Sequence, residues 1–393
     1  MSKKRKLGNS QFTYNEKVKL PRSLFKRTFQ HKTTINGGLL IPFMVDEVLP
    51  GDTFNIKHSV FARLSTPLHP MMDNAKIETF YFFVPNRLLW DSWETFKTGK
   101  DETKIIPKVK PELVKDKTET IGSINDYFGI PSALIKSDTG LKKINALPYR
   151  AYNLIFEKWF KPEFIDEKDY TPKTDDEEKS SNEFGINGEP FRVTKKRDYF
   201  TTALPTPQAG TMPQVPISSL NLVGNGKNIN LQRNDNAQGI LFGGQANEST
   251  RSGLTVGFTA GENDAIGFAK GLPVGIDTTG GGFTINDFRT AMQIQSILEK
   301  DMRFGQRYIE HVYAHYGVVS DDGRLQNPEF ITGSTFSVDI NQVPQTSETA
   351  DTPQGNLAAF GISGGRGKKG IFTATEDGYL IGLMTVRADV NYQ

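Results

Sequence analysis

The segment IETFYFFV, residues 77–84, is the most aromatic strand-like stretch of the chain and decides the fold class. Aromatic and β-branched residues in such a run favour a β-strand. A second apolar run, residues 39–45, predicts a buried strand, and residues 53–64 alternate as a half-buried strand does. Little helical pattern separates these segments, which favours antiparallel sheets. We therefore predict a mainly β fold.

The composition supports this prediction and excludes several classes of protein. The 393 residues include 37 glycines, 21 prolines and 27 phenylalanines, a mixture typical of short strands joined by irregular loops. Cysteine is absent, which excludes disulfides, thiolate metal sites and cysteine nucleophiles. The longest apolar runs fall well short of the roughly 20 residues that span a bilayer. The first six residues are not followed by the apolar core of a secretory signal, so we expect a cytoplasmic protein without membrane insertion.

Positive charge is concentrated at the amino terminus. Residues 1–32 contain ten basic residues and one acidic residue, a balance of +9 that leaves −7 for the rest of a chain whose total is +2. One interpretation of this charge is a solubilising tail. Charge confined to an arm, however, favours neutralisation of nucleic-acid phosphates. Phe12 and Tyr14 could stack on unpaired bases. The predicted DNA-binding residues are Lys3, Lys4, Arg5, Lys6, Lys17 and Lys19.

The pattern along the chain divides it into four segments. Residues 1–35 form the basic arm, which we expect to lie extended and to gain order by docking. Residues 36–208 hold the first part of the β core with helical insertions, and an acidic, turn-rich stretch at 166–189 within them predicts a solvated surface loop. Residues 209–283 are rich in Gly and Asn and predict an excursion from the core. Residues 284–393 contain a helical insertion and the remaining core strands.

Two short helices are predicted in the first part of the core. One spans about residues 87–97, with Asn86 as its cap and Gly99 as its stop. Its apolar face contains Leu89, Trp90, Trp93 and Phe96. The other spans about residues 149–160.

The longest predicted helix begins at Thr284, where Asp287 completes a capping box with Asp in place of Glu. Gly305 ends it, and a further helical stretch continues to about residue 316. We expect its apolar stripe to be an ordinary packing face, formed by Phe288, Met292, Ile294, Ile297, Leu298 and Met302.

No motif in the sequence supports a catalytic, metal or cofactor site. His311 and His315 have the i, i+4 spacing of helical metal ligands, but Val312 stands where a zincin has its Glu and no third ligand is evident, so a packed or interfacial pair is favoured. The segment GISGGRGKKG, residues 361–370, lacks the Ser or Thr that follows the lysine of a phosphate-binding loop and predicts a flexible basic loop. We therefore predict that the protein is not an enzyme and uses no cofactor.

Several long strings resemble the major capsid proteins of microviruses, the gokushovirus branch in particular. The resemblance covers nearly the whole chain except the Gly/Asn-rich excursion, and ordered matches of this length are far more specific than a short motif. The strings are TTINGGLLIP (33–42), DEVLPGDTF (46–54), FFVPNRLLW (82–90), ALPYRAY (146–152), RDYFTTALP (197–205), LQNPE (325–329) and IGLMTVRAD (381–389).

The resemblance implies an eight-stranded viral jelly roll, an antiparallel β-sandwich with helical and loop insertions. Copies would close into a small T=1 icosahedral shell around circular single-stranded DNA, so the protein would reside in the virion after assembly in the cytoplasm of a host bacterium. Residues 209–283 would project at the threefold axes toward a host surface receptor. The arm would face the genome or an internal scaffolding protein, and minor virion proteins would be further partners. Family members usually continue beyond residues 386–389, so we expect the jelly roll to lack its C-terminal strands.

Two other classes remain as alternatives. A lectin-like carbohydrate-binding β-sandwich would be a monomer or small oligomer that binds glycans without nucleic acid. A glycosidase on a β scaffold would lose turnover when one of two carboxylates is replaced. Both alternatives treat the long family-like strings as coincidence.

Overall fold

The computed structural model describes the chain from residue 21 to residue 389 with internal gaps, and in residues 221–277 it describes backbone alone. The gaps are residues 66–72, 115–120, 132, 134, 136–142, 163–165, 167, 197–198, 200–202, 214–220, 225–230, 234–265, 269–273, 278–283, 306, 351–352 and 356. The chain divides into two compact units, the first formed by residues 1–196 with 321–393 and the second by residues 197–320.

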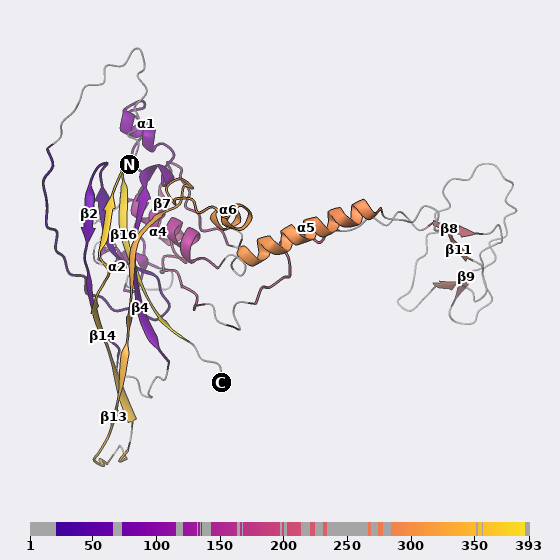
Figure 1. Ribbon diagram of the computed structural model, residues 1–393. Coiled ribbons are helices and arrows are strands. Elements are labelled where there is room, and N and C mark those ends of the chain that lie inside the picture. Colours follow the sequence, from indigo (N-terminus) through magenta and orange to yellow (C-terminus); the bar gives the residue numbers. More distant parts are fainter. Residues whose placement is uncertain are drawn as a thin grey trace. The chain divides into compact units, whose positions relative to one another are not determined.

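A four-stranded antiparallel sheet is the centre of the first unit (Figure 1). Its strands lie in the order β1 (Ile41–Val48), β16 (Gly378–Ala388), β4 (Ala75–Pro85) and β12 (Glu329–Ser337). Ile381 of β16 is paired with Val45 on one side and with Phe82 on the other, and Phe82 is paired in turn with Phe330. The strand predicted at residues 77–84 is therefore confirmed as β4, and it occupies an interior position in the sheet.

Both faces of this sheet are covered along the second half of β4, which explains its aromatic run at residues 80–83. Phe82 and Val84 pack on one face against a helical layer, while Tyr81 and Phe83 pack on the other against two short strands. These strands, β2 (Thr53–Ile56) and β15 (Gly370–Thr373), form a second antiparallel pair. The Phe83 and Phe372 rings lie 4.8 Å apart across this interface. A strand segment buried on both faces has no polar face, so residues 80–84 are apolar without alternation.

A third sheet contains β13 (Asp339–Pro344), β14 (Leu357–Arg366) and β3 (Ser59–Arg63), in that order. The single strand expected at residues 53–64 is divided into β2 and β3. The division falls at His58, whose ring lies 3.0 Å from the Thr79 hydroxyl and whose carbonyl accepts a hydrogen bond from Gly367. With several antiparallel sheets and few helices, the fold is mainly β, as predicted.

The helical layer is formed by residues between β4 and residue 196. It includes α2 (Ile124–Tyr127) and α4 (Leu147–Ile155), which continues into η2 (Phe156–Phe160). The helix expected at residues 149–160 is confirmed. The helix expected at 87–97 is wrong as one element, because the chain forms η1 (Asn86–Leu88) and then α1 (Trp93–Thr98). The Asp91 amide between them donates to Thr174 rather than to a helical carbonyl, and Gly99 ends α1 at φ 67° as predicted.

The acidic stretch at residues 166–189 is packed against the body, which corrects its interpretation as a solvated loop. It contributes β7 (Lys179–Ser180) and η3 (Ser181–Glu183). Strand β7 pairs with β5 (Lys108–Lys110), and β5 pairs on its other side with β6 (Ile144–Asn145). Ser181 is fully buried and Phe184 belongs to the main core. Its acidic residues 175–178 each pair with a basic side chain, so its charge pattern reflects internal ion pairs as well as solvation.

The second unit contains α5 (Ile285–Phe304) and α6 (Tyr308–Tyr316). Thr284 and Asp287 form the predicted capping box, and Gly305 ends α5 as predicted. The unit also contains four short strands, β8 (Asn221–Gly224) paired with β11 (Val274–Asp277) and β9 (Leu231–Arg233) paired with β10 (Ile266–Phe268). Most of the predicted excursion, residues 209–283, lies outside the described residues.

Candidate assembly and nucleic-acid surfaces

The described part of the basic arm, residues 21–35, has no helix or strand and is almost entirely exposed. The Leu24 side chain is fully exposed. Arg27 pairs with Asp46 at 2.6 Å, and the Arg22 guanidinium donates to the Gly51 carbonyl. These two arginines therefore contact the β1 end of the body, through contacts that are individually weak because they are exposed to solvent. The predicted DNA-binding residues Lys3, Lys4, Arg5, Lys6, Lys17 and Lys19 lie outside the described residues.

The third sheet presents apolar side chains to solvent. Along β14 buried and exposed positions alternate, and the exposed row includes Phe360 and Ile362. Phe61 on the neighbouring β3 is 80% exposed, and Ile371 on β15 is 63% exposed. Within the described residues β3 is an edge strand of its sheet. Exposed apolar groups beside an open sheet edge are typical of a surface that contacts another protein.

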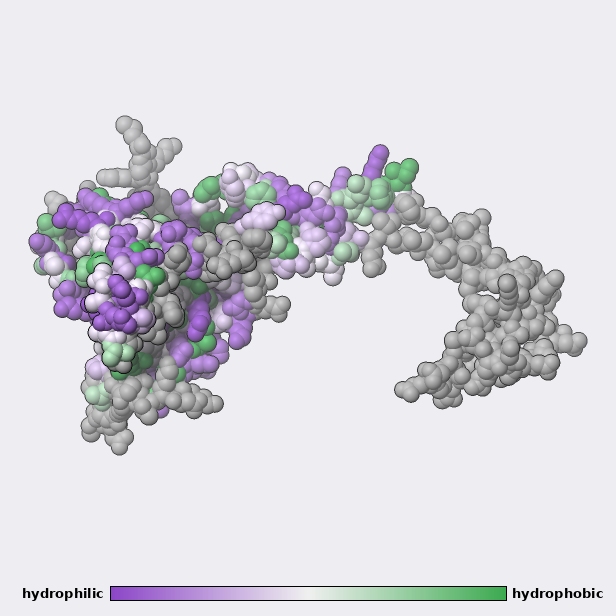
Figure 2. Space-filling model, turned by 90° about the horizontal axis from the view of Figure 1, so that it is seen from below, coloured by the Kyte–Doolittle hydropathy of each residue, from purple (hydrophilic) through white to green (hydrophobic). Residues whose placement is uncertain are grey.

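Helix α5 also exposes much of its apolar stripe. Phe288, Met292 and Ile297 are each 45–58% exposed, whereas Met302 is buried and contacts the Thr206 hydroxyl. Hydrophobic residues are accordingly visible on the surface of α5 in the space-filling view (Figure 2). The stripe was predicted to be an ordinary packing face, and within the described residues of a single chain most of it is not covered. Helical periodicity predicted the apolar face correctly but could not predict what covers it.

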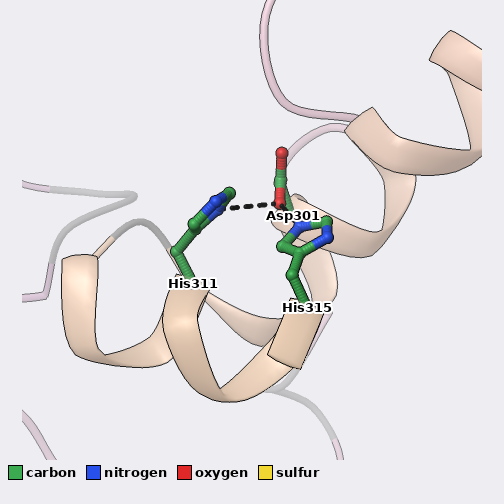
Figure 3. A group of neighbouring side chains, drawn as sticks. All are labelled: Asp301, His311 and His315. Carbon is green, nitrogen blue, oxygen red and sulfur yellow. Dashed lines mark hydrogen bonds and ion pairs between the residues drawn. The ribbon is translucent and has the colours of Figure 1, made fainter. Parts of the chain in front are cut away.

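At the junction of α5 and α6, His311 and His315 point toward Asp301 (Figure 3). Asp301 Oδ1 lies 3.3 Å from His311 Nδ1 and 2.6 Å from His315 Nε2, and the two imidazole centroids are 4.4 Å apart. All three side chains are partly buried. The i, i+4 spacing identified the two histidines, whereas Asp301 was not predicted. The available signal was an Asp one turn before the end of the preceding helix, on the far side of the turn at Gly305.

The ionisable groups inside the body are used for structure. Tyr152 donates its hydroxyl hydrogen to the Leu40 carbonyl and accepts a hydrogen bond from the Phe191 amide. Burial raises the pKa of Tyr152, and burial likewise raises the pKa of Tyr81 to about 12, so both hydroxyls stay protonated at neutral pH. The Tyr152 hydroxyl thereby joins α4 to the backbone at Leu40 and Phe191.

No helix among the described residues is both long and apolar enough to cross a bilayer. The features that distinguish this chain are an aromatic β-sheet covered on both faces and apolar side chains left exposed on β3, β14, β15 and α5. They define a structural protein that functions through contacts with other protein chains.

Comparison with known proteins specifies this class. Residues 15–393 match the family described as "Capsid protein (F protein)". The chain is 38% identical to capsid protein VP1 of Bdellovibrio phage phiMH2K, over 96% of this chain and 71% of that protein. It is 34% identical to capsid protein VP1 of Chlamydia phage 1, over 100% and 76%, and 30% identical to that of Spiroplasma virus 4, over 95% and 70%. The chain belongs to this family of phage capsid proteins, which confirms the resemblance to microvirus major capsid proteins.

Family membership also establishes the general role of the chain. It is a structural component of a phage virion and not an enzyme, as predicted. A capsid protein assembles with copies of itself, so the exposed apolar surfaces described above are candidates for contacts between copies.

Proposed function

We propose that this capsid protein closes into a small T=1 icosahedral shell around a circular single-stranded DNA genome. In this proposal the basic arm contacts the DNA or an internal scaffolding protein, and residues 209–283 project outward toward a host surface receptor. Minor virion proteins are further partners, and assembly takes place in the cytoplasm of the host bacterium. The observation that carries the proposal is the match to phage capsid proteins along almost the whole chain.

The strand order supports an eight-stranded jelly roll as the shell-forming fold. In a jelly roll the first, eighth, third and sixth strands form one sheet, and the second and seventh strands pair in the other. If β1 is the first strand, β4 the third, β12 the sixth and β16 the eighth, the observed order β1-β16-β4-β12 is the expected one. The pairs β2–β15 and β3–β14 then correspond to the second and seventh strands. In this assignment β16 is the eighth strand of the jelly roll. The expectation that the jelly roll lacks its C-terminal strands is therefore not part of the proposal.

The charge distribution supports a genome-facing role for the arm. Residues 1–32 carry +9 and the remainder −7, so cationic charge is available on one segment while the body repels phosphate weakly. Lys3, Lys4, Arg5, Lys6, Lys17 and Lys19 are the proposed phosphate contacts. Such contacts need no base recognition, which suits a coat protein that packages a whole genome.

Electron microscopy of the expressed chain tests the shell. Closed particles of one diameter are expected, and a chain that stays monomeric at high concentration would contradict the proposal.

The arm is tested by deleting residues 1–6. We expect shells that still form but retain less DNA, with a shallower dependence of DNA retention on salt because fewer counterions are released. A deletion of residues 347–350, an exposed turn without basic residues, is the control. Unchanged DNA content after the first deletion would rule out the arm as the DNA contact.

A further inference from the structure

We propose that Asp301, His311 and His315 bind a zinc ion that fastens α6 to the last turn of α5. The three side chains provide two imidazole nitrogens and one carboxylate oxygen, a donor set that suits zinc and leaves a fourth tetrahedral position for water. Their donor atoms all lie within 4.8 Å of one another (Figure 3). The site departs from the expectation that the two histidines only pack, because the third ligand comes from a different helix.

The spacing of the donor atoms fits such a site with a small adjustment. Two ligands of tetrahedral zinc, each about 2.0–2.1 Å from the metal, are separated by about 3.3 Å. Asp301 Oδ1 and His311 Nδ1 are already 3.3 Å apart. Asp301 Oδ1 and His315 Nε2 are 2.6 Å apart, which is hydrogen-bonding distance, and must separate by about 0.7 Å. Both imidazoles lie beside the same carboxylate oxygen, and all three donor atoms lie within 4.8 Å of one another. The two imidazole nitrogens must take the same separation of about 3.3 Å around the ion.

The turn between the helices holds this geometry in place. Gly305 has φ 111°, and a Cβ there would lie 1.9 Å from Glu310 Oε2, so a larger residue would displace the Glu310 side chain. Glu310 in turn accepts a hydrogen bond from the Arg307 amide at 3.2 Å and caps α6. This turn fixes the start of α6 and with it the direction in which His311 and His315 point. A site held by such a supporting turn loses little conformational freedom on binding metal.

The surroundings allow a cation to enter. The His311 side chain is 45% exposed and Asp301 25%, so the donors can be reached from solvent. Two nearby arginines are paired with carboxylates, Arg303 at 3.7 Å from Glu299 and Arg307 at 3.9 Å from Glu310. These two pairs reduce the repulsion that the arginines exert on a divalent ion.

Metal binding to the purified full-length protein tests the proposal. The protein is stripped of metal with a chelator, reloaded with excess Zn²⁺ and desalted, after which we expect about one zinc per chain by elemental analysis. Reloading the stripped protein with Co²⁺ instead should give the visible absorption bands of tetrahedral cobalt. His311→Gln, His315→Gln and Asp301→Asn should each weaken zinc binding by about 100-fold or more, since even indirect ligand partners contribute 10–100-fold. His31→Gln, on the exposed arm, is the matched control and should bind as the unaltered protein does. Undiminished binding by the double variant His311→Gln/His315→Gln, or no binding by the unaltered protein, would overturn the proposal.

A second measurement needs no variant and so does not depend on how a variant folds. Diethyl pyrocarbonate modifies accessible imidazoles, and mass spectrometry locates the modified peptides. Zinc should protect His311 and His315 several-fold while leaving His31 as reactive as before. Equal modification of the pair with and without zinc would exclude the site.

Discussion

The Arg150 guanidinium is buried to 1% exposure and pairs with Asp175 across 3.3 Å between Nη2 and Oδ1. Its Nη1 also donates to the Leu89 carbonyl at 3.0 Å, and its Nη2 to the Asp175 carbonyl at 2.9 Å. This one side chain of α4 thereby joins the segment after β4 to the acidic stretch that the sequence suggested was solvated. Burial lowers the pKa of Arg150, and the carboxylate of Asp175 opposes that effect.

Arg150→Leu should destabilise the subunit strongly. The substitution leaves the Leu89 and Asp175 carbonyls without their shared donor, and each buried acceptor left unsatisfied costs about 1–3 kcal/mol. Urea unfolding followed by tryptophan fluorescence measures the loss. Asp175→Asn keeps the carbonyl contact and should cost less, about 1 kcal/mol. Equal losses for the two variants would show that the carboxylate, and not the bridging guanidinium, dominates.

Glu78 of β4 makes part of the stability depend on pH. Burial disfavours its charged form, but hydrogen bonds from Lys196 and Arg387 outweigh burial, so its pKa lies below the ordinary value of 4.5. The unfolded chain therefore takes up the proton more readily than the folded one. The stabilisation is present above about pH 4.5 and is lost as pH falls through the folded pKa.

Glu78→Gln should flatten this dependence. The variant is less stable at pH 7 because Arg387 and Lys196 lose their partner, by about 1–3 kcal/mol. The difference in unfolding free energy between the two proteins should shrink as the pH falls below about 4.5 and through the lowered pKa of Glu78. Both proteins contain the same other carboxylates, so the contribution of these groups cancels in the difference. A difference in unfolding free energy that stays constant with pH would contradict the role of Glu78.

Gly378, the first residue of β16, is required by a close approach to β4. A Cβ there would lie 2.4 Å from the Val84 carbonyl oxygen and 2.5 Å from the Phe83 ring, and the backbone oxygen cannot move aside cheaply. Gly378→Ala should therefore cost about 1–3 kcal/mol in unfolding free energy, as overpacking typically does. Gly364 of β14 is the matched control, because its Cβ would meet nothing closer than 3.7 Å. Gly364→Ala should change stability by less than about 0.5 kcal/mol.

Local sequence signals predicted the helices and strands of this fold better than they predicted which strands pair with one another. The aromatic run at 77–84 was sufficient to predict β4, and Thr284 with Asp287 was sufficient to predict the start of α5, because strand preference and capping depend on a few adjacent residues. The position of β16 between β1 and β4 depends on pairing across more than three hundred residues, which no local pattern encodes.

The candidate sites show the same division. The spacing of His311 and His315 is visible in the sequence, but Asp301 joins them only because the turn at Gly305 folds α6 back toward α5. The apolar stripe of α5 is likewise visible, while its exposure is a tertiary property. The arm could be recognised from charge alone, since charge is a property of composition.

Phe61 offers a direct test of the surfaces that copies use to assemble. It lies on β3, at an edge of its sheet, with 80% of its surface exposed, so the isolated subunit gains little from it. Burying such a side chain between two copies would contribute about 1.5–3 kcal/mol per contact, repeated throughout a closed shell. Phe61→Asp should therefore leave urea unfolding of the subunit within about 0.5 kcal/mol of the unaltered protein while greatly lowering the yield of closed particles.

Phe61→Leu is the control, because it keeps an apolar group at the same place and should preserve most of the yield. Sedimentation separates particles from free subunits and measures both variants. Normal particle yield from Phe61→Asp would exclude this edge of β3 as a contact. A parallel loss of subunit stability would mean that the aspartate harms the sheet itself, because an exposed position that only contacts another copy cannot affect the unfolding of a single chain.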